Sequence, residues 1–263
     1  MKISAAIITY NEERNIARCL ESLGEVADEI VVLDSFSTDR TEEICENHDV
    51  KFFTNPFEGH IQQKNHALSL VTHDWVLSLD ADEALSGELQ TRILQLKKNG
   101  PTVDGYIFNR LTNYCGKWIN HGGWYPDKKM RLWNKNQGRW GGQNPHDRVE
   151  MDENTKTMVI NEDILHYSYY SVDQHIDQIN KFSSIAAKEM SRRQKRVVLV
   201  FHLLIYPFLT FVRNYFFKLG ILDGYSGFIL AINGSFYKFQ KYTKLFLLKK
   251  NNYAKASDEL LQS

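Results

Sequence analysis

The sequence predicts an α/β fold in which a mostly parallel sheet carries helices on both faces. Apolar runs of strand length alternate with helical segments over the first hundred residues, and the runs are apolar throughout, as in strands buried on both faces. Polar clusters follow the first, second and fourth runs. Ligands bind beyond the carboxyl ends of the strands in such sheets, so we expect these clusters to meet at one edge.

The first strand is expected at residues 3–9, and its apolar run continues directly into polar residues. Asn11 is a plausible N-cap of the helix that follows, with Glu12 and Glu13 in its first turn. A second strand is expected at residues 29–33.

The second helix is expected to open at Asp39, because Glu42 follows three residues later in the pattern of a capping box. The remaining elements of this half are a strand at 51–54, a helix at 58–71, a strand at 75–79 and a helix at 86–98.

The later part of the chain changes character twice. Residues 102–167 contain short strand-like pieces and most of the tryptophans, which indicates a smaller, partly antiparallel extension of the sheet. Beyond residue 172 the pattern is helical. We therefore expect one domain over 1–170, with halves 1–100 and 101–170, and a basic, apolar helical extension over 171–263.

Composition limits the function classes. The 263 residues carry a formal net charge of zero, so no global field favours nucleic acid as a partner. The charge is uneven, because 14 Lys and Arg stand against 4 Asp and Glu from Lys181 onward. Three scattered cysteines and a first segment that suits a strand better than a signal peptide predict free thiols and a cytoplasmic location.

The sequence LDADE places Asp80, Asp82 and Glu83 at the end of the fourth strand. Two carboxylates that reach one point suit a hard divalent cation such as Mg²⁺ or Mn²⁺. For the motif alone a solvated acidic turn is the more common explanation, but its position after a buried strand of an α/β sheet favours a site. Glu83 is expected to face solvent or to orient the loop.

Four elements in order resemble the inverting glycosyltransferases of the GT-A fold, family 2. They are TYNE (Thr9 to Glu12), DSFSTDRT (Asp34 to Thr41), QQKNHAL (Gln62 to Leu68) and LDADE (Leu79 to Glu83). The later stretches WYPDKKMRLW, PHDRVEM, ILHYSY and LDGYSGFILAI are similar to the branch that includes the lipopolysaccharide-core β-1,4-glucosyltransferases. The resemblance covers most of the chain and is strongest before residue 90.

The resemblance implies roles for individual residues. Asp34 would accept a hydrogen bond from the nucleotide base, with a turn cap as the alternative. Lys64 would face the diphosphate or base, or else be a solvated helical lysine. Asp82 would be the principal metal ligand. The nucleotide-sugar contacts implied are Thr9, Tyr10, Asn11, Glu12, Asp34, Lys64, Asp80, Ala81 and Arg131.

Two further positions keep alternatives open. His166 would be a second metal ligand, although a lone histidine is more often structural. Arg131 would balance charge on the diphosphate or on an anionic acceptor, or else be solvated at a strand edge.

The resemblance also implies a catalytic base for a single-displacement transfer. Asp147, after His146, stands at the position where related sequences often have Glu, so its reach is one methylene shorter. A surface-loop aspartate paired with Arg148 is the alternative, and Asp127 is the rival base.

The resemblance implies metal-dependent transfer of a hexose, glucose or a similar sugar, from a UDP-sugar to a lipopolysaccharide-core or other glycan or glycolipid acceptor. The apolar run 197–212 is shorter than a membrane span and has a basic flank, which is typical of an interfacial helix at the inner membrane face. A buried packing helix is the alternative. The oligomeric state is left open.

Two other function classes stay open. A sugar nucleotidyltransferase can share the architecture, but the sequence lacks a Gly-rich loop after the first strand. A non-catalytic nucleotide-sugar-binding protein would keep the sheet without needing a base.

Overall fold

The computed structural model describes residues 1–143, 146–195 and 197–261, with side chains for all of these except 146 and 251–261. The chain forms two compact units, which are described separately. The first unit comprises residues 1–112 and 126–168, and the second comprises 113–125 and 169–263. The sequence boundary at 170 lies close to this division, but segment 113–125, expected in the first domain, belongs to the second unit.

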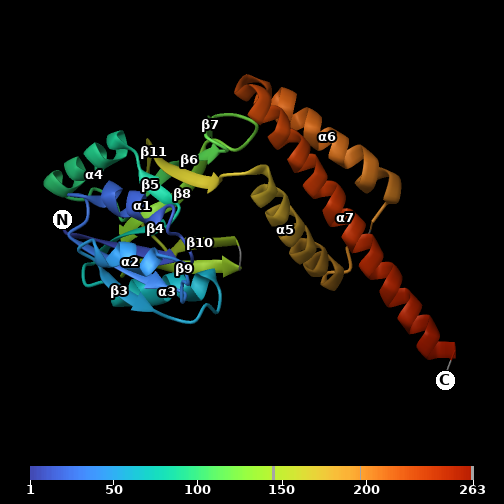
Figure 1. The fold of residues 1–263 in the computed structure, drawn as a ribbon, viewed down its shortest axis with the longest axis horizontal. Helices are drawn as coiled ribbons and strands as arrows, with labels where there is room; N and C mark the ends of the chain where they lie inside the picture. Colours follow the sequence, from blue (N-terminus) through green and yellow to red (C-terminus); the bar gives the residue numbers. More distant parts are fainter. Residues whose placement is uncertain (144–145, 196, 262–263) are drawn as a thin grey trace. The chain divides into compact units, whose positions relative to one another are not determined.

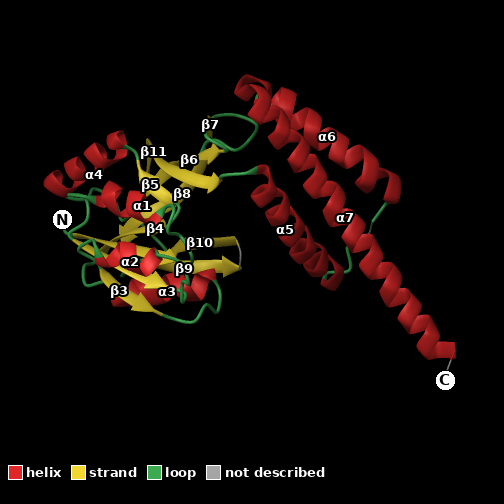
Figure 2. Ribbon diagram, in the orientation of Figure 1, coloured by secondary structure: helices red, strands yellow, loops and turns green. Residues whose placement is uncertain are grey.

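The first unit is built on a mixed sheet with the strand order β3-β2-β1-β4-β8-β6-β11-β5 (Figure 2). Its parallel part consists of β1 (Ile3–Thr9), β2 (Glu29–Asp34), β3 (Lys51–Thr54) and β4 (Trp75–Asp80). The added strands are β5 (Glu83–Leu85), β6 (Gly105–Tyr114), β8 (Asp127–Asn134) and β11 (Thr157–Tyr169). A separate antiparallel pair is formed by β9 (Gly138–Gln143) and β10 (His146–Met151). The predicted α/β class and its antiparallel extension are confirmed.

Strand register brings the three polar clusters together. Thr9 pairs with Asp34 between β1 and β2, and Ile8 pairs with Asp80 between β1 and β4. Because the three strands are parallel, the loops that follow them leave from the same edge of the sheet. The predicted convergence is confirmed.

Helices cover both faces of this sheet (Figure 1). Alternate residues of β1 point to opposite sides: Ile3, Ala5 and Ile7 enter one core cluster and Ala6 enters the other. The first cluster is closed by α1 (Ile16–Leu23), α2 (Thr41–Glu46) and α4 (Gly87–Asn99), and the second by α3 (His60–Leu70).

The first helix begins later than the sequence indicates. Asn11 has a positive φ of 54°, and helix α1 begins at Ile16 after Asn15. The Asn11 side chain instead accepts a hydrogen bond from the backbone N–H of Thr38 at 2.7 Å. The predicted N-cap at Asn11 is wrong, because the Asn11 side chain is hydrogen-bonded to the loop after β2 instead of to the first turn of α1.

The second unit is helical, with the short strand β7 (Lys117–Ile119) in segment 113–125. Its helices are α5 (Val172–Arg192), α6 (Tyr206–Val212) and α7 (Gly224–Leu261). Turns of π-helix, Phe201–Ile205 and Arg213–Phe217, extend α6 at both ends.

Helix α7 holds this unit together. Lys244 donates to the Asn180 side-chain oxygen of α5 at 2.7 Å. Toward α6, Ser235 of α7 donates to the carbonyl of Pro207 at 2.8 Å. The ring centroids of Tyr242 and His202 lie 4.4 Å apart. These contacts show that α6 and α7 pack side by side in antiparallel directions.

Among the described residues, no single helix has both the length and the hydropathy of a membrane span. One bent pair, Phe201–Phe217 with Gly220–Lys250, meets the criteria of length and composition together.

Candidate functional site

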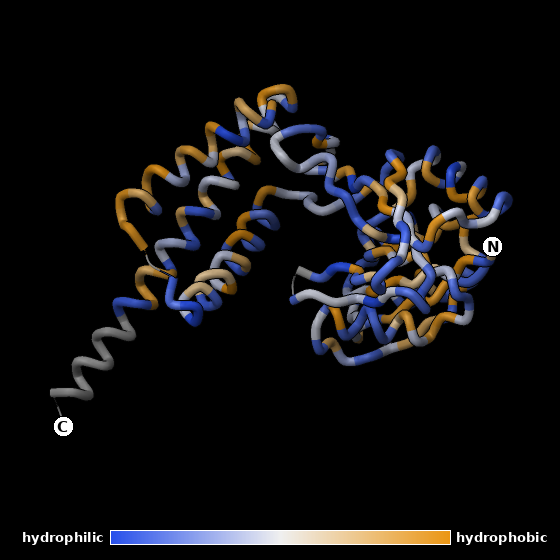
Figure 3. Tube along the Cα trace, turned by 180° about the vertical axis from the view of Figure 1, so that it is seen from behind, coloured by the Kyte–Doolittle hydropathy of each residue, from blue (hydrophilic) through white to orange (hydrophobic). Residues whose placement is uncertain are grey.

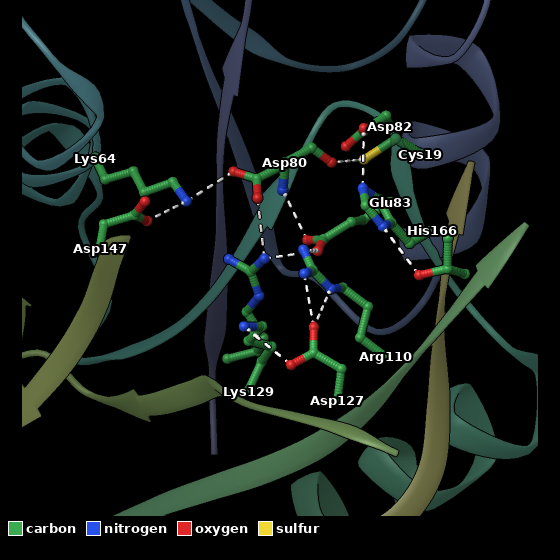
Figure 4. A network of polar contacts seen from close by, with 12 residues as sticks. Cys19, Lys64, Asp80, Asp82, Glu83, Arg110, Asp127, Lys129, Asp147 and His166 are labelled. Atoms are coloured by element: carbon green, nitrogen blue, oxygen red, sulfur yellow. Dashed lines mark hydrogen bonds and ion pairs between the residues drawn. The ribbon is translucent and has the colours of Figure 1, made fainter. Parts of the chain in front are cut away.

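Asp80, at the end of β4, is held by two buried cations (Figure 4). Lys64 Nζ lies 2.9 Å from Asp80 Oδ1, and Arg131 Nη2 donates to Asp80 Oδ2 at 2.9 Å. Burial opposes the ionisation of Asp80, but the two cations outweigh it and hold the pKa of this carboxyl well below its ordinary value. Asp80 is therefore a fixed anion between two fixed cations.

Lys64 also connects Asp80, at the end of β4, with Asp147 on β10. Its Nζ donates to Asp147 Oδ2 at 2.8 Å and lies 4.2 Å from the ring centroid of Trp140. The Lys64 side chain is only 5% exposed, so the alternative of a solvated helical lysine is wrong. The alternative of Asp147 paired with Arg148 is wrong too, because Arg148 pairs with Glu150.

Glu83 is the hub of a second group of ion pairs. It accepts from Arg131 at 2.6 Å, from Arg110 at 3.4 Å and from the backbone N–H of Asp80 at 3.0 Å. Arg110 also donates to Asp127 at 2.7 Å. Glu83 is 1% exposed, so the expectation that it faces solvent is wrong, while its bond to Asp80 N–H does orient the loop. Two arginines make this burial possible.

Arg131 is also buried, at 2% exposure, so solvation at a strand edge does not describe it. Its Nε and Nη1 atoms find no hydrogen-bond partner among the described residues. A guanidinium with unused donors beside an acidic strand end is suited to an anionic ligand. The rival base Asp127 is a third exposed and is held by Arg110 and Lys129.

Asp82 and His166 form a pair apart from these networks. His166 Nε2 lies 3.1 Å from Asp82 Oδ2, and the Asp82 side chain is about a quarter exposed, at 26%. Burial opposes the ionisation of Asp82, and the nearby His166 more than offsets it, so the pKa of Asp82 lies below its ordinary value.

The donor set of this pair fits a divalent cation. Two ligands about 2.1 Å from one ion and at right angles to each other are about 3 Å apart, which is close to the Asp82–His166 separation. Among the described residues, no three His, Cys, Asp or Glu side chains are grouped to hold a metal. Such a set of two suits a cation that takes its other ligands from substrate phosphates and water.

The loops after β1 and β2 are tied to each other. Ser37 donates through its backbone N–H and its hydroxyl to the two carboxylate oxygens of Asp34, which is 2% exposed. Ser37 Oγ also accepts from the backbone N–H of Asn11 at 2.7 Å. Asp34 thus has the geometry of a turn cap, while Tyr10, at 58% exposure, is open to a ligand.

Three other predicted positions lie at or behind this edge. Burial raises the pKa of Glu12 to about 7, with a smaller contribution from Asp82 and despite a hydrogen bond from Asn15. Thr9 is 5% exposed, and its hydroxyl has no hydrogen-bond partner among the described residues. Ala81 is 3% exposed and packs in the core, so it offers a ligand no side-chain contact.

Sequence reasoning missed three features of this site: Glu83 as an ion-pair hub, Arg110, and the contact of Trp140 with Lys64. A signal existed for Arg110, because it interrupts the strand-like run GYIFNRL with a charge. Trp140 packs edge-to-face on Trp133 at 5.9 Å and presents its ring to Lys64. Its sequence neighbourhood, GRWGG, carries no comparable signal.

Comparison with known proteins identifies the family of this chain. The family model described as glycosyl transferase family 2 matches residues 4–151. An uncharacterized glycosyltransferase of Rickettsia felis is 33% identical over 100% of this chain and 96% of its own length. The lipopolysaccharide core biosynthesis glycosyltransferase LpsC of Rhizobium meliloti is 29% identical, over 94% of this chain and 92% of its own length.

Among solved structures, S. aureus TarS 1-349 in complex with UDP is similar with a TM-score of 0.47 and 16% identity, over 95% of this chain and 92% of that one. The chain belongs to glycosyl transferase family 2 and is a glycosyltransferase of the GT-A fold.

Proposed function

We propose that this glycosyltransferase is a metal-dependent inverting enzyme that moves a hexose, specifically glucose, from a UDP-sugar to a lipopolysaccharide-core or related surface-glycan acceptor. The observation that carries the proposal is the double contact of Lys64 with Asp80 and Asp147. Through this contact Lys64, which would bind the diphosphate, lies next to Asp147, which would accept the proton of the acceptor hydroxyl.

The transfer would be a single displacement. The acceptor oxygen attacks the anomeric carbon, the bond from that carbon to the diphosphate oxygen breaks, and Asp147 takes the proton of the acceptor hydroxyl. UDP leaves with the electron pair. Lys64 and the unused donors of Arg131 stabilise the charge that develops on the diphosphate.

The contacts of Lys64 suggest that the donor binds before Asp147 can act as the base. While the Lys64 ammonium donates to Asp147 Oδ2 at 2.8 Å, that carboxylate oxygen is engaged and is not free to accept a proton from an acceptor hydroxyl. A diphosphate competes for the same ammonium group and would draw it away. Asp147 would then be available as a base only when donor is bound, which limits wasteful activation of water.

Asp82 and His166 would hold Mg²⁺ or Mn²⁺. When bound, the cation would offset negative charge on the leaving diphosphate. The nucleoside would lie across the ends of β1 and β2, against Thr9, Tyr10, Asn11, Glu12 and Asp34, with Asp80 toward the ribose or diphosphate. Asp34 would have to release Ser37 to accept from the base.

The acceptor class is the finer part of the proposal. It is supported by the full-length similarity to LpsC, a lipopolysaccharide core biosynthesis glycosyltransferase. Such an acceptor is lipid-linked, so the enzyme would work in the cytoplasm at the inner face of the membrane.

The test is a panel of nucleotide sugars with the purified full chain, with and without Mn²⁺. Thermal stabilisation reports donor binding, and UDP release reports turnover. We expect Asp147→Asn to lose about 10²- to 10⁴-fold in turnover while donor still stabilises the protein. Asp82→Asn should lose the Mn²⁺-dependent part of the stabilisation. Asp152→Asn, the same change at an exposed turn, should behave as wild type.

Three outcomes would contradict the proposal. Full turnover of Asp82→Asn in a chelator would remove the metal. Donor binding without turnover, unchanged in Asp147→Asn, would indicate a binding protein. Pyrophosphate release from UTP and a sugar phosphate would indicate a nucleotidyltransferase.

A further inference from the structure

The second unit leaves many apolar side chains of α6 and α7 exposed. Figure 3 shows where hydrophobic residues, in orange, occur along the trace of these helices. We call residues 198–217 the first arm and helix α7 the second arm. On the first arm the exposed apolar residues are spaced three and four apart, so they share one side of the helix. They are Phe201, Leu204, Ile205, Phe208 and Leu209, preceded by Val198, Leu199 and Val200.

The second arm continues this surface. Tyr225, Ile232 and Phe239 recur every seven residues on α7, with Phe228 and Leu247 on the same side, and all five are exposed. Helix α5 packs on a different side of α7, where Lys244 contacts Asn180 and where Tyr242 and Leu245 are buried. The exposed stripe is therefore not the face that joins the helices of this unit.

The turn between the arms is apolar as well. Phe217 and Tyr225 are each 80% exposed, and Leu222 is 63% exposed. Soluble monomers rarely expose a continuous apolar patch that covers two helices and the turn between them. The patch needs an occupant.

Charge identifies the occupant. From residue 190 to 250 the sequence has eleven Lys and Arg but a single acid, Asp223. Asp223 is 3% exposed and its carboxylate is engaged by His121, so it adds no negative charge to the surface. Exposed Arg213 and Lys218 lie within the apolar segment, and Arg192, Arg193 and Lys195 precede it. Of the cations named, Arg193 is paired with Glu189 at 2.8 Å, which leaves a clear excess of positive charge. An apolar face with such a basic border is complementary to a bilayer that contains anionic lipids.

The orientation follows from where the exposed residues lie. They run along both arms, from Val198 to Phe217 and from Tyr225 to Leu247, the latter about 33 Å of helix. A hairpin inserted end-on would need apolar side chains mainly at its tip, and here the tip also carries Lys218 and its contacts with segment 113–125. The length of the stripe favours a hairpin that lies flat.

We propose that the α6–α7 hairpin is a monotopic membrane anchor that lies in the plane of one leaflet, with its exposed apolar stripe among the acyl chains and its basic residues at anionic headgroups. This also answers the alternative left open for 197–212: the segment is paired with α7 on one side and faces lipid on the other. The inference rests on this surface and not on the donor chemistry.

The test is flotation of the full chain with phosphatidylcholine vesicles, with and without phosphatidylglycerol. We expect binding that is at least about tenfold stronger with the anionic lipid. The double variant Phe208→Glu/Phe217→Glu should lose that binding and keep its thermal unfolding. Ile185→Glu, at a 42% exposed apolar position of α5, is the matched control and should bind as wild type.

Depth separates the two orientations. Tryptophan placed singly at Phe208, Phe217 and Tyr225 should gain similar, shallow quenching by brominated lipid relative to wild type. Quenching that deepens steadily toward the turn would overturn the flat orientation. Absence of vesicle binding, or a dimer that the same double variant dissociates, would overturn the anchor in favour of a second copy of the chain. Vesicle binding without UDP-sugar turnover would keep the anchor and reject the proposed function.

Discussion

The two units of this chain use burial in opposite ways. The first unit buries charge: Asp80, Glu83, Lys64 and Arg131 are packed at the strand ends and compensate one another. In the second unit many large apolar side chains are exposed, while the one acid between residues 190 and 250 is buried. The comparison teaches that the first unit is organised to hold a charged ligand in a fixed field, and the second to meet an apolar environment.

Breaking the buried charge network should give the largest effect. Arg131→Met removes the partner 2.6 Å from Glu83 and one of the two cations on Asp80. Because Glu83 stays buried with one of its two cations lost, we expect the free energy of unfolding to fall by about 3–5 kcal/mol, measured by denaturant titration. Arg148→Met, which breaks an exposed pair with Glu150, is the control and should cost less than about 1 kcal/mol. Equal losses in the two variants would contradict this description of the first unit.

Acid should loosen the second unit before the first. Burial lowers the pKa of His175 from 6.5 to about 4, in a cluster where Asn233 lies 2.9 Å from its ring nitrogen. The unfolded chain therefore binds more protons than the folded one between these values, so stability is full above pH 6.5 and falls toward pH 4. The loss is at most about 3 kcal/mol.

The first unit has a matching acid-sensitive group at lower pH. Burial opposes the ionisation of Glu29, but hydrogen bonds from Lys51, Ser4 and Thr72 lower its pKa from 4.5 to about 2. Its stabilisation is complete above pH 4.5 and is lost only as the pH falls toward 2. Hydrogen exchange at pH 7 and pH 5 should show a lower free energy of opening for α5 and α7 at pH 5. The opening of β1 and β2 should not become easier, because the pKa of Glu12, raised by burial to about 7, makes the first unit more stable as the pH falls from 7. Simultaneous opening of both units would refute the order.

The smallest effect is expected where the second unit is already exposed. Tyr225→Ser removes a side chain that is 80% exposed, so the stability in water should change by less than about 0.5 kcal/mol. Leu230→Ala, five residues along the same helix and 4% exposed, should cost about 2–5 kcal/mol. Calorimetry of the two variants measures the contrast. A large loss in Tyr225→Ser would mean that this face is covered.

Much of the fold could be predicted from the sequence because its signals are local. Apolar runs of strand length lie within a few residues, and so does the predicted helix start at Asp39, whose carboxylate accepts from the N–H of Thr41 where α2 begins. The meeting of Thr9, Asp34 and Asp80 also followed, since parallel strands share a carboxyl edge. The N-cap at Asn11 failed because its side chain is used by Thr38, a residue 27 positions away.

The partners of the acids could not be predicted in the same way. Glu83 is compensated by Arg110 and Arg131, which are 27 and 48 residues distant and lie on antiparallel strands. No local pattern sets the register of β6 and β8 against β4, and that register includes an irregularity between Tyr106 and Ile107. Trp140 reaches Lys64 from β9 by the same kind of long-range packing.

The sequence by itself determined where the acids are: at the ends of buried parallel strands, on one edge, in a chain with a basic, apolar second part. Only the tertiary structure decided how each acid is compensated, and so what each is free to do. Asp80 is fixed by Lys64 and Arg131, and Glu83 is buried between two arginines. Asp82 pairs with His166 and is about a quarter exposed. The reason is physical: strand ends follow from periodicity along the chain, whereas the field at a carboxylate depends on charges a few ångströms away in space, which non-local packing supplies.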